Sequence, residues 1–393
     1  MIRSGDINKE PIRPVVYGVM LYFLLAGTDC FSVGSFGSFL KIIALLPMGL
    51  AFLEMRKLKI RFSAGMVLQL LFWFIAAVSL FYSIKIDQTF ASAKTLTLNL
   101  LLIAIIGGFE QYNQRELRYM QRAMMLGGWV TILLMFLLSD ISVGDRLTLV
   151  IGNSSQDQNY INGFFLYTFS WHCNQLIQEK KKLHIIPVLF IIAVVLLTGS
   201  RGGLVAFILV LFVHVCISFT RTEHTIRNII LTALLIVVLF VAFDLILMQL
   251  PENIAERFSW DYIEEKGTTG RSRIWRLLLQ HYSDDGFFRM LFGHGYGTSR
   301  FVDTATGNVA HNLYLDNLLT IGLIGLILQL TSQTAIIWIL IRRRQYALLA
   351  AYFGIIGMYM SLSLLAYKPA WNIIILAFAI DFHEKSKPHA FKV

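Results

Sequence analysis

Three separated groups of residues in this sequence could act on an anionic substrate. The first is Arg201, which stands among small residues in "LTGSRGG" with apolar sequence on both sides. A guanidinium stays charged and can direct two N–H donors at one phosphate group, a geometry that lysine cannot reproduce. An arginine that extends from lipid to a membrane headgroup would produce the same pattern. Arg201 alone therefore leaves an anion-binding role and a purely structural role open.

The second group is the cluster "GRSRIWR", which contains Arg271, Arg273 and Arg276. Helical spacing over residues 270–282 puts apolar side chains, Trp275 among them, on one side and Arg273 and Arg276 on the other. We predict an amphipathic helix at the membrane interface, with Trp275 at headgroup depth as a weaker candidate for substrate contact. The guanidiniums would face either water or a bound anion.

The third group is His311 and Asn312 in "AHNLYLDNLL", where an apolar helix is expected to begin. The N-terminus of a helix favours anions and disfavours an imidazolium, so His311 would stay neutral and could act as a general base beside a bound phosphate. A packing or capping role for His311 is the alternative. Asn312, and His294 in the glycine-spaced "FGHGYG", are weaker candidates for substrate contact. The glycine spacing itself predicts a tight turn.

Metal and cofactor chemistry leave no recognisable pattern in the sequence. The three cysteines, Cys30, Cys173 and Cys216, are scattered and show no ligand spacing. No paired histidine or aspartate motif that holds a metal occurs. We therefore expect neither a metal nor another cofactor.

The elements that must position these residues are membrane helices. The 393-residue chain is 56% hydrophobic and 15% charged, whereas about a quarter of the residues in a soluble domain are charged. Apolar runs of membrane-spanning length recur from end to end. We predict an all-α polytopic membrane protein, one integral membrane domain over residues 1–393 with about twelve helices. The predicted helices span residues 14–29, 38–54, 65–84, 92–109, 123–139, 163–178, 184–199, 204–220, 228–248, 313–341, 346–365 and 370–381.

The distribution of basic residues predicts the orientation. With both termini in the cytoplasm, the cytoplasmic segments carry most of the 34 Lys and Arg, as the positive-inside rule requires. The net charge of +10 thus reflects topology, and nucleic acid is not an expected partner. This orientation places Arg201 and a long loop, residues 249–312, on the extracytoplasmic side. A loop of that length in a compact protein is usually functional or disordered, and its aromatic content argues against disorder.

Taken in order, "LTGSRGG", "GRSRIW", "LFGHGYG" and "AHNLYLDNLLTIGLIG" around one long outer loop resemble the O-antigen ligase and O-antigen/capsule polymerase superfamily. These are integral membrane glycosyltransferases of the GT-C type. The resemblance covers roughly residues 190–345, and the first half of the chain agrees only in hydropathy and topology. It implies that Arg201 and Arg271 correspond to the family's arginines and His311 to its catalytic histidine. Arg273 and Arg276 have no firm counterpart.

The resemblance also implies a reaction. A glycan linked to polyprenyl diphosphate would be transferred to a sugar hydroxyl with inversion and without a metal, at the outer face of a bacterial cytoplasmic (inner) membrane. The implied partners are the lipid-linked oligosaccharide, membrane lipid, a chain-length regulator and a flippase. We favour a polymerase of O-antigen, capsule or exopolysaccharide repeat units over a ligase that transfers the glycan to lipopolysaccharide core. A polysaccharide transporter is a third hypothesis, which the lack of two similar halves disfavours.

Overall fold

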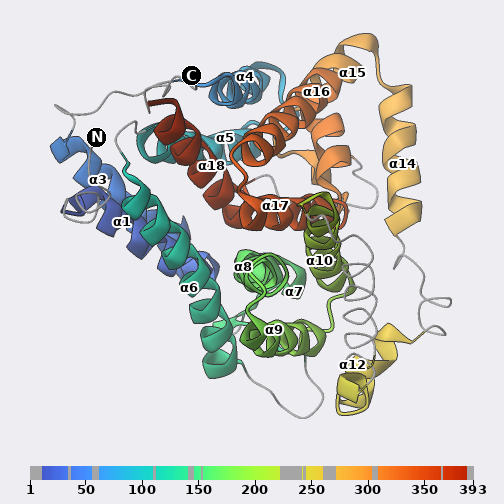
Figure 1. Cartoon of the computed structure of the whole chain (residues 1–393). Helices are drawn as coiled ribbons and strands as arrows, with labels where there is room; N and C mark the ends of the chain where they lie inside the picture. The colour runs from blue at the N-terminus through green and yellow to red at the C-terminus, as the bar shows by residue number, and fades with distance from the viewer. Residues whose placement is uncertain are drawn as a thin grey trace.

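The computed structural model describes residues 11–33, 37–54, 62–108, 112–139, 146–151, 154–221, 241, 245–259, 271–302, 309–363 and 366–386. Within them, α-helices form one bundle, and two antiparallel pairs of two-residue strands lie in connections (Figure 1). The strands are β1 Ser32–Val33 with β2 Gly37–Ser38, and β3 Val150–Ile151 with β4 Ser154–Ser155. The helices are α1 Pro14–Leu24, η2 Ala26–Cys30, α2 Phe39–Ile43, α3 Leu45–Glu54, α4 Ala64–Val78, η5 Ser79–Tyr82, α5 Ile86–Leu102, η6 Ile103–Gly107, α6 Gln114–Leu138, α7 Gln158–Asn162, η7 Gly163–Phe165, α8 Leu166–Ile177, η8 Lys182–His184, α9 Ile185–Leu197, α10 Arg201–Arg221, α12 Glu252–Ala255, η9 Glu256–Phe258, α14 Arg271–Asp284, α15 Phe287–Phe292, η10 Ser299–Phe301, α16 Leu313–Arg342, α17 Tyr346–Tyr359 and α18 Lys368–Ser386.

The predicted class, an all-α polytopic membrane protein, is confirmed. Within the described residues, five helices are long and apolar enough to cross a membrane, and three shorter helices are apolar as well. The five are Ala64–Tyr82, Ile86–Gly107, Gln114–Leu138, Arg201–Thr220 and Leu313–Arg342. The predicted span over residues 228–248 lies almost entirely outside the described residues.

Two predicted helix starts were wrong. The helix expected from residue 92 begins at Ile86, and α6 begins at Gln114 rather than at residue 123. A capping box starts α6, because Asn113 and Glu116 each accept the other's backbone N–H at 2.9 Å. The buried Glu116 carboxylate also pairs with Arg13 at 2.7 Å. A hydropathy average does not detect polar helical turns that are stabilised by such hydrogen bonds and ion pairs.

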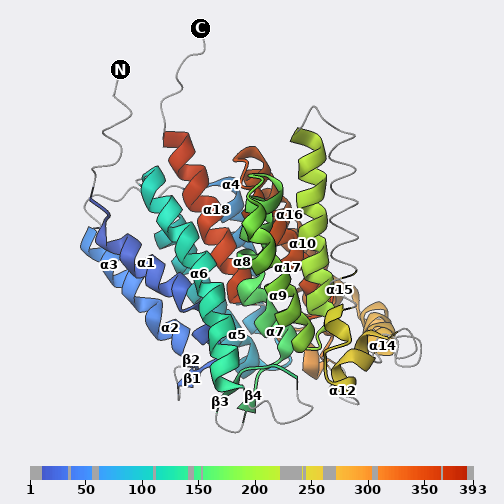
Figure 2. The same ribbon diagram turned by 60° about the horizontal axis from the view of Figure 1, so that its bottom comes forward.

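The centre of the bundle is α18, which α6, α16 and α17 surround (Figures 1 and 2). Every residue from Ala370 to Phe382 on this helix is buried. A helix that is apolar on all sides belongs in the interior, so the first residues of α18 are carried into the core as well.

A break in α16 joins this helix to the preceding loop. Gly322 has φ +68°, ψ −171°, which interrupts the helix after its third turn. The break leaves carbonyl groups free, and the N–H groups of His294 and Gly295 donate to Leu319 and Thr320 at 3.0 and 2.9 Å. The turn predicted from "FGHGYG" is confirmed by positive φ angles at its three glycines. It docks against the break.

Figure 2 shows β1–β2, β3–β4, α12 and α14 together at one end of the bundle. The last turn of α6 and the first turn of α10 lie at the same end, while α18 finishes at the opposite one. We call the first of these the site end, because the residues singled out in the sequence meet there.

Candidate active site

The turn between α9 and α10 presents Arg201 as the first residue of α10. Gly199 has φ +59°, a left-handed conformation that glycine adopts without steric cost. The Ser200 hydroxyl then accepts the N–H of Gly203 at 2.9 Å and starts the helix. Arg201 is thus fixed at the end of a membrane helix, half-buried, with its backbone held by this cap.

A second polar segment packs beneath this turn. Asn162 on α7 donates from Nδ2 to the hydroxyl of Thr198 at 3.1 Å, and the hydroxyl of Ser200 is hydrogen-bonded to Asn159. A Cβ on Gly203 would overlap the Asn162 amide, so the glycine allows this close approach. As a result, Asp157 at the start of α7 is brought to the same end of α10.

Two arginines that the sequence did not single out also converge on the turn. Arg146 donates to the carbonyls of Thr198 at 2.8 Å and Gly199 at 3.2 Å. Arg257 donates to the same Gly199 carbonyl at 3.1 Å. One carbonyl oxygen thus holds two guanidiniums beside Arg201. No spacing in the sequence connects these residues, because they come from different loops.

Helix α14, which confirms the predicted amphipathic helix, positions the segment before α16. Its Leu278 is buried against Ala310, Leu315 and Leu319. The indole Nε1 of Trp275 donates to the Ala310 carbonyl at 2.7 Å. Trp275 therefore holds the residue that precedes His311.

The residue that follows His311 is fixed as well. Asn312 is buried, its Oδ1 caps α16 by accepting the N–H groups of Tyr314 and Leu315 at 3.0 and 3.1 Å, and its own N–H donates to the Ser363 hydroxyl at 3.2 Å. His311 itself has φ +47° and an exposed side chain. A residue other than glycine is uncommon in this region, where strain is often found at functional sites.

The electrostatics of the site couple four groups from separate parts of the chain. Burial lowers the pKa of His311, the Arg271 guanidinium lowers it further, and the Asp157 carboxylate acts in the opposite direction. Burial likewise lowers the pKa of Arg271, Asp157 raises it, and Arg201 lowers it. Arg271 therefore lies within range of the charges of Arg201, Asp157 and His311, and Asp157 also lies within range of His311. We call Arg201, Arg271, His311 and Asp157 the catalytic cluster.

The remaining sequence candidates lie differently. Arg273 and Arg276 are exposed on α14, past the half-buried Arg271. His294 lies in the glycine-spaced turn, with Nε2 3.3 Å from Asp285 Oδ1 and Nδ1 3.1 Å from the Leu319 carbonyl oxygen. Within the described residues, no three His, Cys, Asp or Glu side chains are grouped so that they could hold a metal ion.

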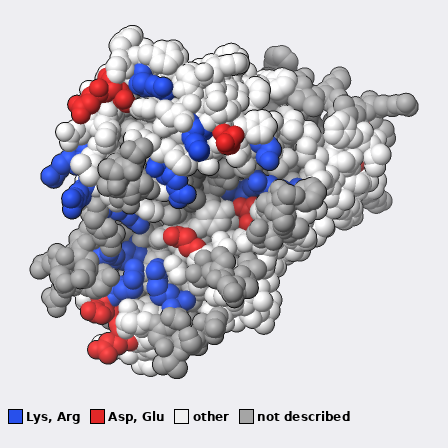
Figure 3. Space-filling view, turned by 180° about the vertical axis from the view of Figure 1, so that it is seen from behind, with Lys and Arg blue, Asp and Glu red and all other residues white. Residues whose placement is uncertain are grey.

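On the face turned away from the viewer of Figure 1, Lys and Arg side chains gather around a hollow that also contains acidic side chains (Figure 3). The geometry thus offers two guanidiniums for an anion and a neutral imidazole beside them.

A comparison with known proteins finds a family match for the part of the chain that carries these candidate residues. Residues 186–330 match a family described as O-antigen ligase, a range that includes the three arginines of α14, Arg201 and His311. No curated protein matches. The chain is also similar to one in a structure described as "Structural coordination of polymerization and crosslinking by a peptidoglycan synthase complex", at 13% identity and a TM-score of 0.48, covering 83% of this chain and 99% of that one. The segment 186–330 is therefore similar to the O-antigen ligase family, in agreement with the resemblance that the sequence motifs indicate.

Proposed function

We propose that the protein is a glycosyltransferase that polymerises glycan repeat units linked to polyprenyl diphosphate. The glycan of one lipid carrier is transferred, with inversion and without a metal, to a sugar hydroxyl of a second lipid-linked unit. The observation that carries this proposal is the catalytic cluster. Arg271 lies far from Arg201 in the sequence, and yet it interacts electrostatically with both Arg201 and His311.

The arginines bind the diphosphate of the donor. Arg201 and Arg271 repel each other, and a bound anion between them would relieve that repulsion. As the anomeric C–O bond breaks, its electron pair moves onto the diphosphate oxygen, where fixed guanidiniums stabilise the charge. Arg146 and Arg257 add positive potential from the neighbouring turn.

Arg273 and Arg276 have a different part in this proposal. Both are exposed on the helix that begins with Arg271. These two exposed cations attract the anionic headgroup before it reaches Arg201 and Arg271.

His311 accepts the proton of the attacking hydroxyl. Burial and Arg271 lower its pKa, so the imidazole is neutral and able to act as a base at neutral pH. The deprotonated oxygen forms the new bond to the anomeric carbon on the side opposite the departing diphosphate. Asp157 then stabilises the imidazolium that results, since a nearby carboxylate favours the charged ring.

The site end faces the exterior of the bacterial cytoplasmic membrane, with both termini in the cytoplasm. Basic residues at the opposite end support this orientation, among them Arg115, Arg118 and Arg122 on the first turns of α6 and the run 342–344 after α16. A donor lipid can then stay in the bilayer while its diphosphate reaches the helix ends. A flippase that delivers such units and a chain-length regulator are the partners that this activity requires.

A ligase is the second candidate, which the description of the matching family favours. The two activities share the donor and the cluster and differ in the acceptor. Purified protein in nanodiscs, incubated with lipid-linked repeat units alone, should yield a ladder of lengthened glycans. Product that forms only after lipopolysaccharide core is added would identify a ligase. No product under either condition would contradict glycosyl transfer.

A further inference from the structure

A separate pocket opens at the site end between η2, α2, α5, α7 and the start of α18. It has a volume of about 260 Å³. None of the arginines described above lines it. We call it the lysine pocket, and its lining residues are Asp29, Ser38, Lys41, Thr95, Tyr160, Ser363, Ala366, Tyr367 and Lys368.

The carboxylate of Asp29 in this pocket already accepts hydrogen bonds from uncharged hydroxyl groups. The hydroxyl of Ser38 donates to Asp29 Oδ1 at 2.6 Å, and the hydroxyl of Tyr160 donates to Asp29 Oδ2 at 2.5 Å. Each carboxylate oxygen of Asp29 therefore has a partner within the pocket wall. The aspartate is oriented by these bonds and forms no ion pair with either lysine, although its charge acts on Lys368.

The two lysines have only neutral partners. Lys368 Nζ donates to Asn99 Oδ1 at 2.5 Å, and Lys41 Nζ lies 3.5 Å from the hydroxyl of Thr95. Among the described residues, neither lysine forms an ion pair. Lys368 is only 2% exposed, and burying a lysine without a carboxylate partner is costly. Ionisable residues retained at such positions are candidates for function.

The pocket shares a wall with the catalytic cluster. Ser363 lines it and accepts the N–H of Asn312, the neighbour of His311. On the other side, Tyr160 lines the pocket, and its N–H donates to Asp157, whose charge acts on His311. The pocket is therefore linked through hydrogen bonds to the segment that carries the proposed base, and none of the arginines proposed to bind the diphosphate lines it.

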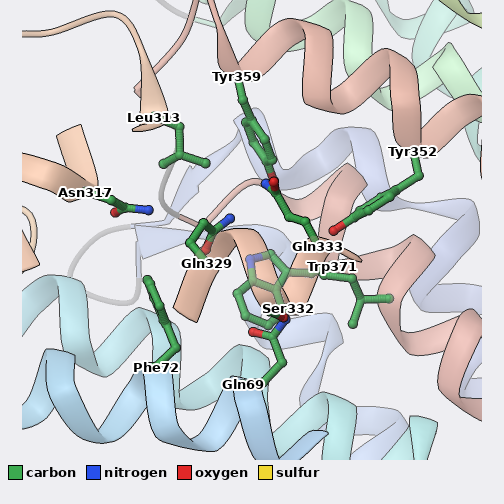
Figure 4. Close-up of a pocket in the computed structure, with 11 residues that line it drawn as sticks. Gln69, Phe72, Leu313, Asn317, Gln329, Ser332, Gln333, Tyr352, Tyr359 and Trp371 are labelled. Atoms are coloured by element: carbon green, nitrogen blue, oxygen red, sulfur yellow. The ribbon is translucent and has the colours of Figure 1, made fainter. Parts of the chain in front are cut away.

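The bundle contains another cavity, of about 20 Å³, which differs in chemistry (Figure 4). Its polar lining residues, such as Gln69, Asn317 and Gln333, are neutral amides and hydroxyls, and none of its described lining residues is charged. The Gln69 amide donates to the Ser332 hydroxyl at 2.5 Å within it. The lysine pocket, by contrast, combines hydroxyl groups and tyrosine rings with two cationic side chains.

We propose that the lysine pocket binds the acceptor end of the glycan and that this end carries an anionic sugar, with its carboxylate or phosphate between Lys41 and Lys368. The inference rests on the proposed function, because it assigns the second substrate of that reaction. The hydroxyl groups of Ser38, Thr95 and Ser363 suit sugar hydroxyls. Lysine acts as a point charge and suits a single anionic substituent, whereas a diphosphate is matched by guanidinium forks.

The test measures binding of the oligosaccharide that mild acid releases from the lipid-linked repeat units of the source organism. This probe lacks the diphosphate, so it does not depend on the arginines. It is used in its native form, after carbodiimide and borohydride reduction of its carboxylates, and after removal of phosphate by hydrofluoric acid. Titration calorimetry is performed with the full chain in nanodiscs, as wild type, as Lys41→Gln and as Lys94→Gln. Lys94 is exposed on α5, next to Thr95, and does not line the pocket.

We expect one of the two treatments to weaken binding to the wild type about tenfold, and that treatment identifies the anionic group. Lys41→Gln should weaken binding of the native probe by the same factor and leave the treated probe unaffected, while Lys94→Gln changes neither. Equal binding of all three probes to the wild type, or equal effects of the two variants, would overturn the inference. The ladder assay is read separately. A ladder without lysine-dependent binding contradicts only this inference, and binding without transfer contradicts only the proposed function.

Discussion

Two glycine-rich turns at the site end, residues 198–203 and 293–297, contain the same kind of backbone and differ in what they gather. Each has glycine at positive φ, and each packs closely against another segment. The first turn offers the Gly199 carbonyl, which Arg146 and Arg257 occupy. The second offers N–H groups, which donate to the carbonyls that the break in α16 leaves free. The Gly293 carbonyl of the second turn also accepts a hydrogen bond from Arg289, at 3.2 Å. Glycine spacing in this sequence therefore indicates close backbone approach, and the first turn binds two guanidiniums where the second binds one.

The two histidines next to these turns differ in the same way. The His294 ring lies between Asp285 and the Leu319 carbonyl, so its nitrogens already have protein partners. The His311 side chain is exposed, and the charges of Arg271 and Asp157 act on it. One ring holds a loop in place, and the other is available to accept a proton from a substrate.

The largest expected effect follows from exchanging each histidine for alanine. His311→Ala should lower the rate of glycan transfer by about 10²–10⁴-fold, because a general base contributes that much. His294→Ala should leave the rate within a few-fold and reduce the melting temperature, since the docked turn loses two contacts. Transfer rates on lipid-linked repeat units and thermal unfolding in detergent measure both. Equal losses of rate in the two variants would contradict the contrast.

The next effect concerns the shape of the cation. Arg271→Lys keeps the charge and removes the two-pronged donor, so we expect transfer to fall by about 10²–10³-fold. Arg300→Lys is the matched control, since Arg300 is exposed in the same loop and outside the cluster. Arg273→Lys and Arg276→Lys should have smaller effects that disappear at high salt, where long-range attraction is screened. A lysine that fully replaces Arg271 would show that only its charge is needed.

Hydropathy predicted most of the fold, because a helix in lipid must be apolar over its whole length. It missed the start of α6, where Asn113 and Glu116 sustain polar helical turns. For the candidate site, residue type and order singled out Arg201, Arg271 and His311. Arg146 and Asp157 were not found, since their role arises from tertiary contacts with the α9–α10 turn.

The lysine pocket could not be predicted from the sequence either. Nothing in the spacing of Lys41 relates it to Lys368 at the far end of the chain. The bundle brings them together around Asp29. Sequence motifs therefore singled out candidate residues that lie within one continuous half of the chain. The lysine pocket, whose residues come from both ends of the chain, became apparent only in the three-dimensional structure.

A third effect tests the structural role of the second turn. Gly322→Ala should destabilise the protein by about 1–3 kcal/mol, because its backbone conformation is strained for any residue with a Cβ and the Leu291 backbone leaves no room. Gly49→Ala is the control, since a Cβ there meets nothing within 4 Å and helical alanine is favoured over glycine by up to about 1 kcal/mol. Thermal unfolding in detergent should move in opposite directions for the two variants. Gly322→Ala with unchanged stability would show that the break in α16 is not needed to dock the turn.

The smallest effect is a shift in pH dependence, and it is the most specific to the first region. The kcat/KM of transfer should rise with pH as His311 loses its proton and level off above a midpoint below the ordinary histidine value, because burial and Arg271 lower the pKa. Arg271→Gln removes a positive charge that lowers the pKa, so its midpoint should lie higher than in the wild type. Asp157→Asn removes a negative charge that raises the pKa, so its midpoint should lie lower, while asparagine can still cap α7. Arg271 and Asp157 are more than a hundred positions apart in the sequence. If their variants shift the midpoint of the pH profile in opposite directions, both charges act on the same imidazole. Identical midpoints in all three proteins would place the titrating group elsewhere and separate His311 from the catalytic cluster.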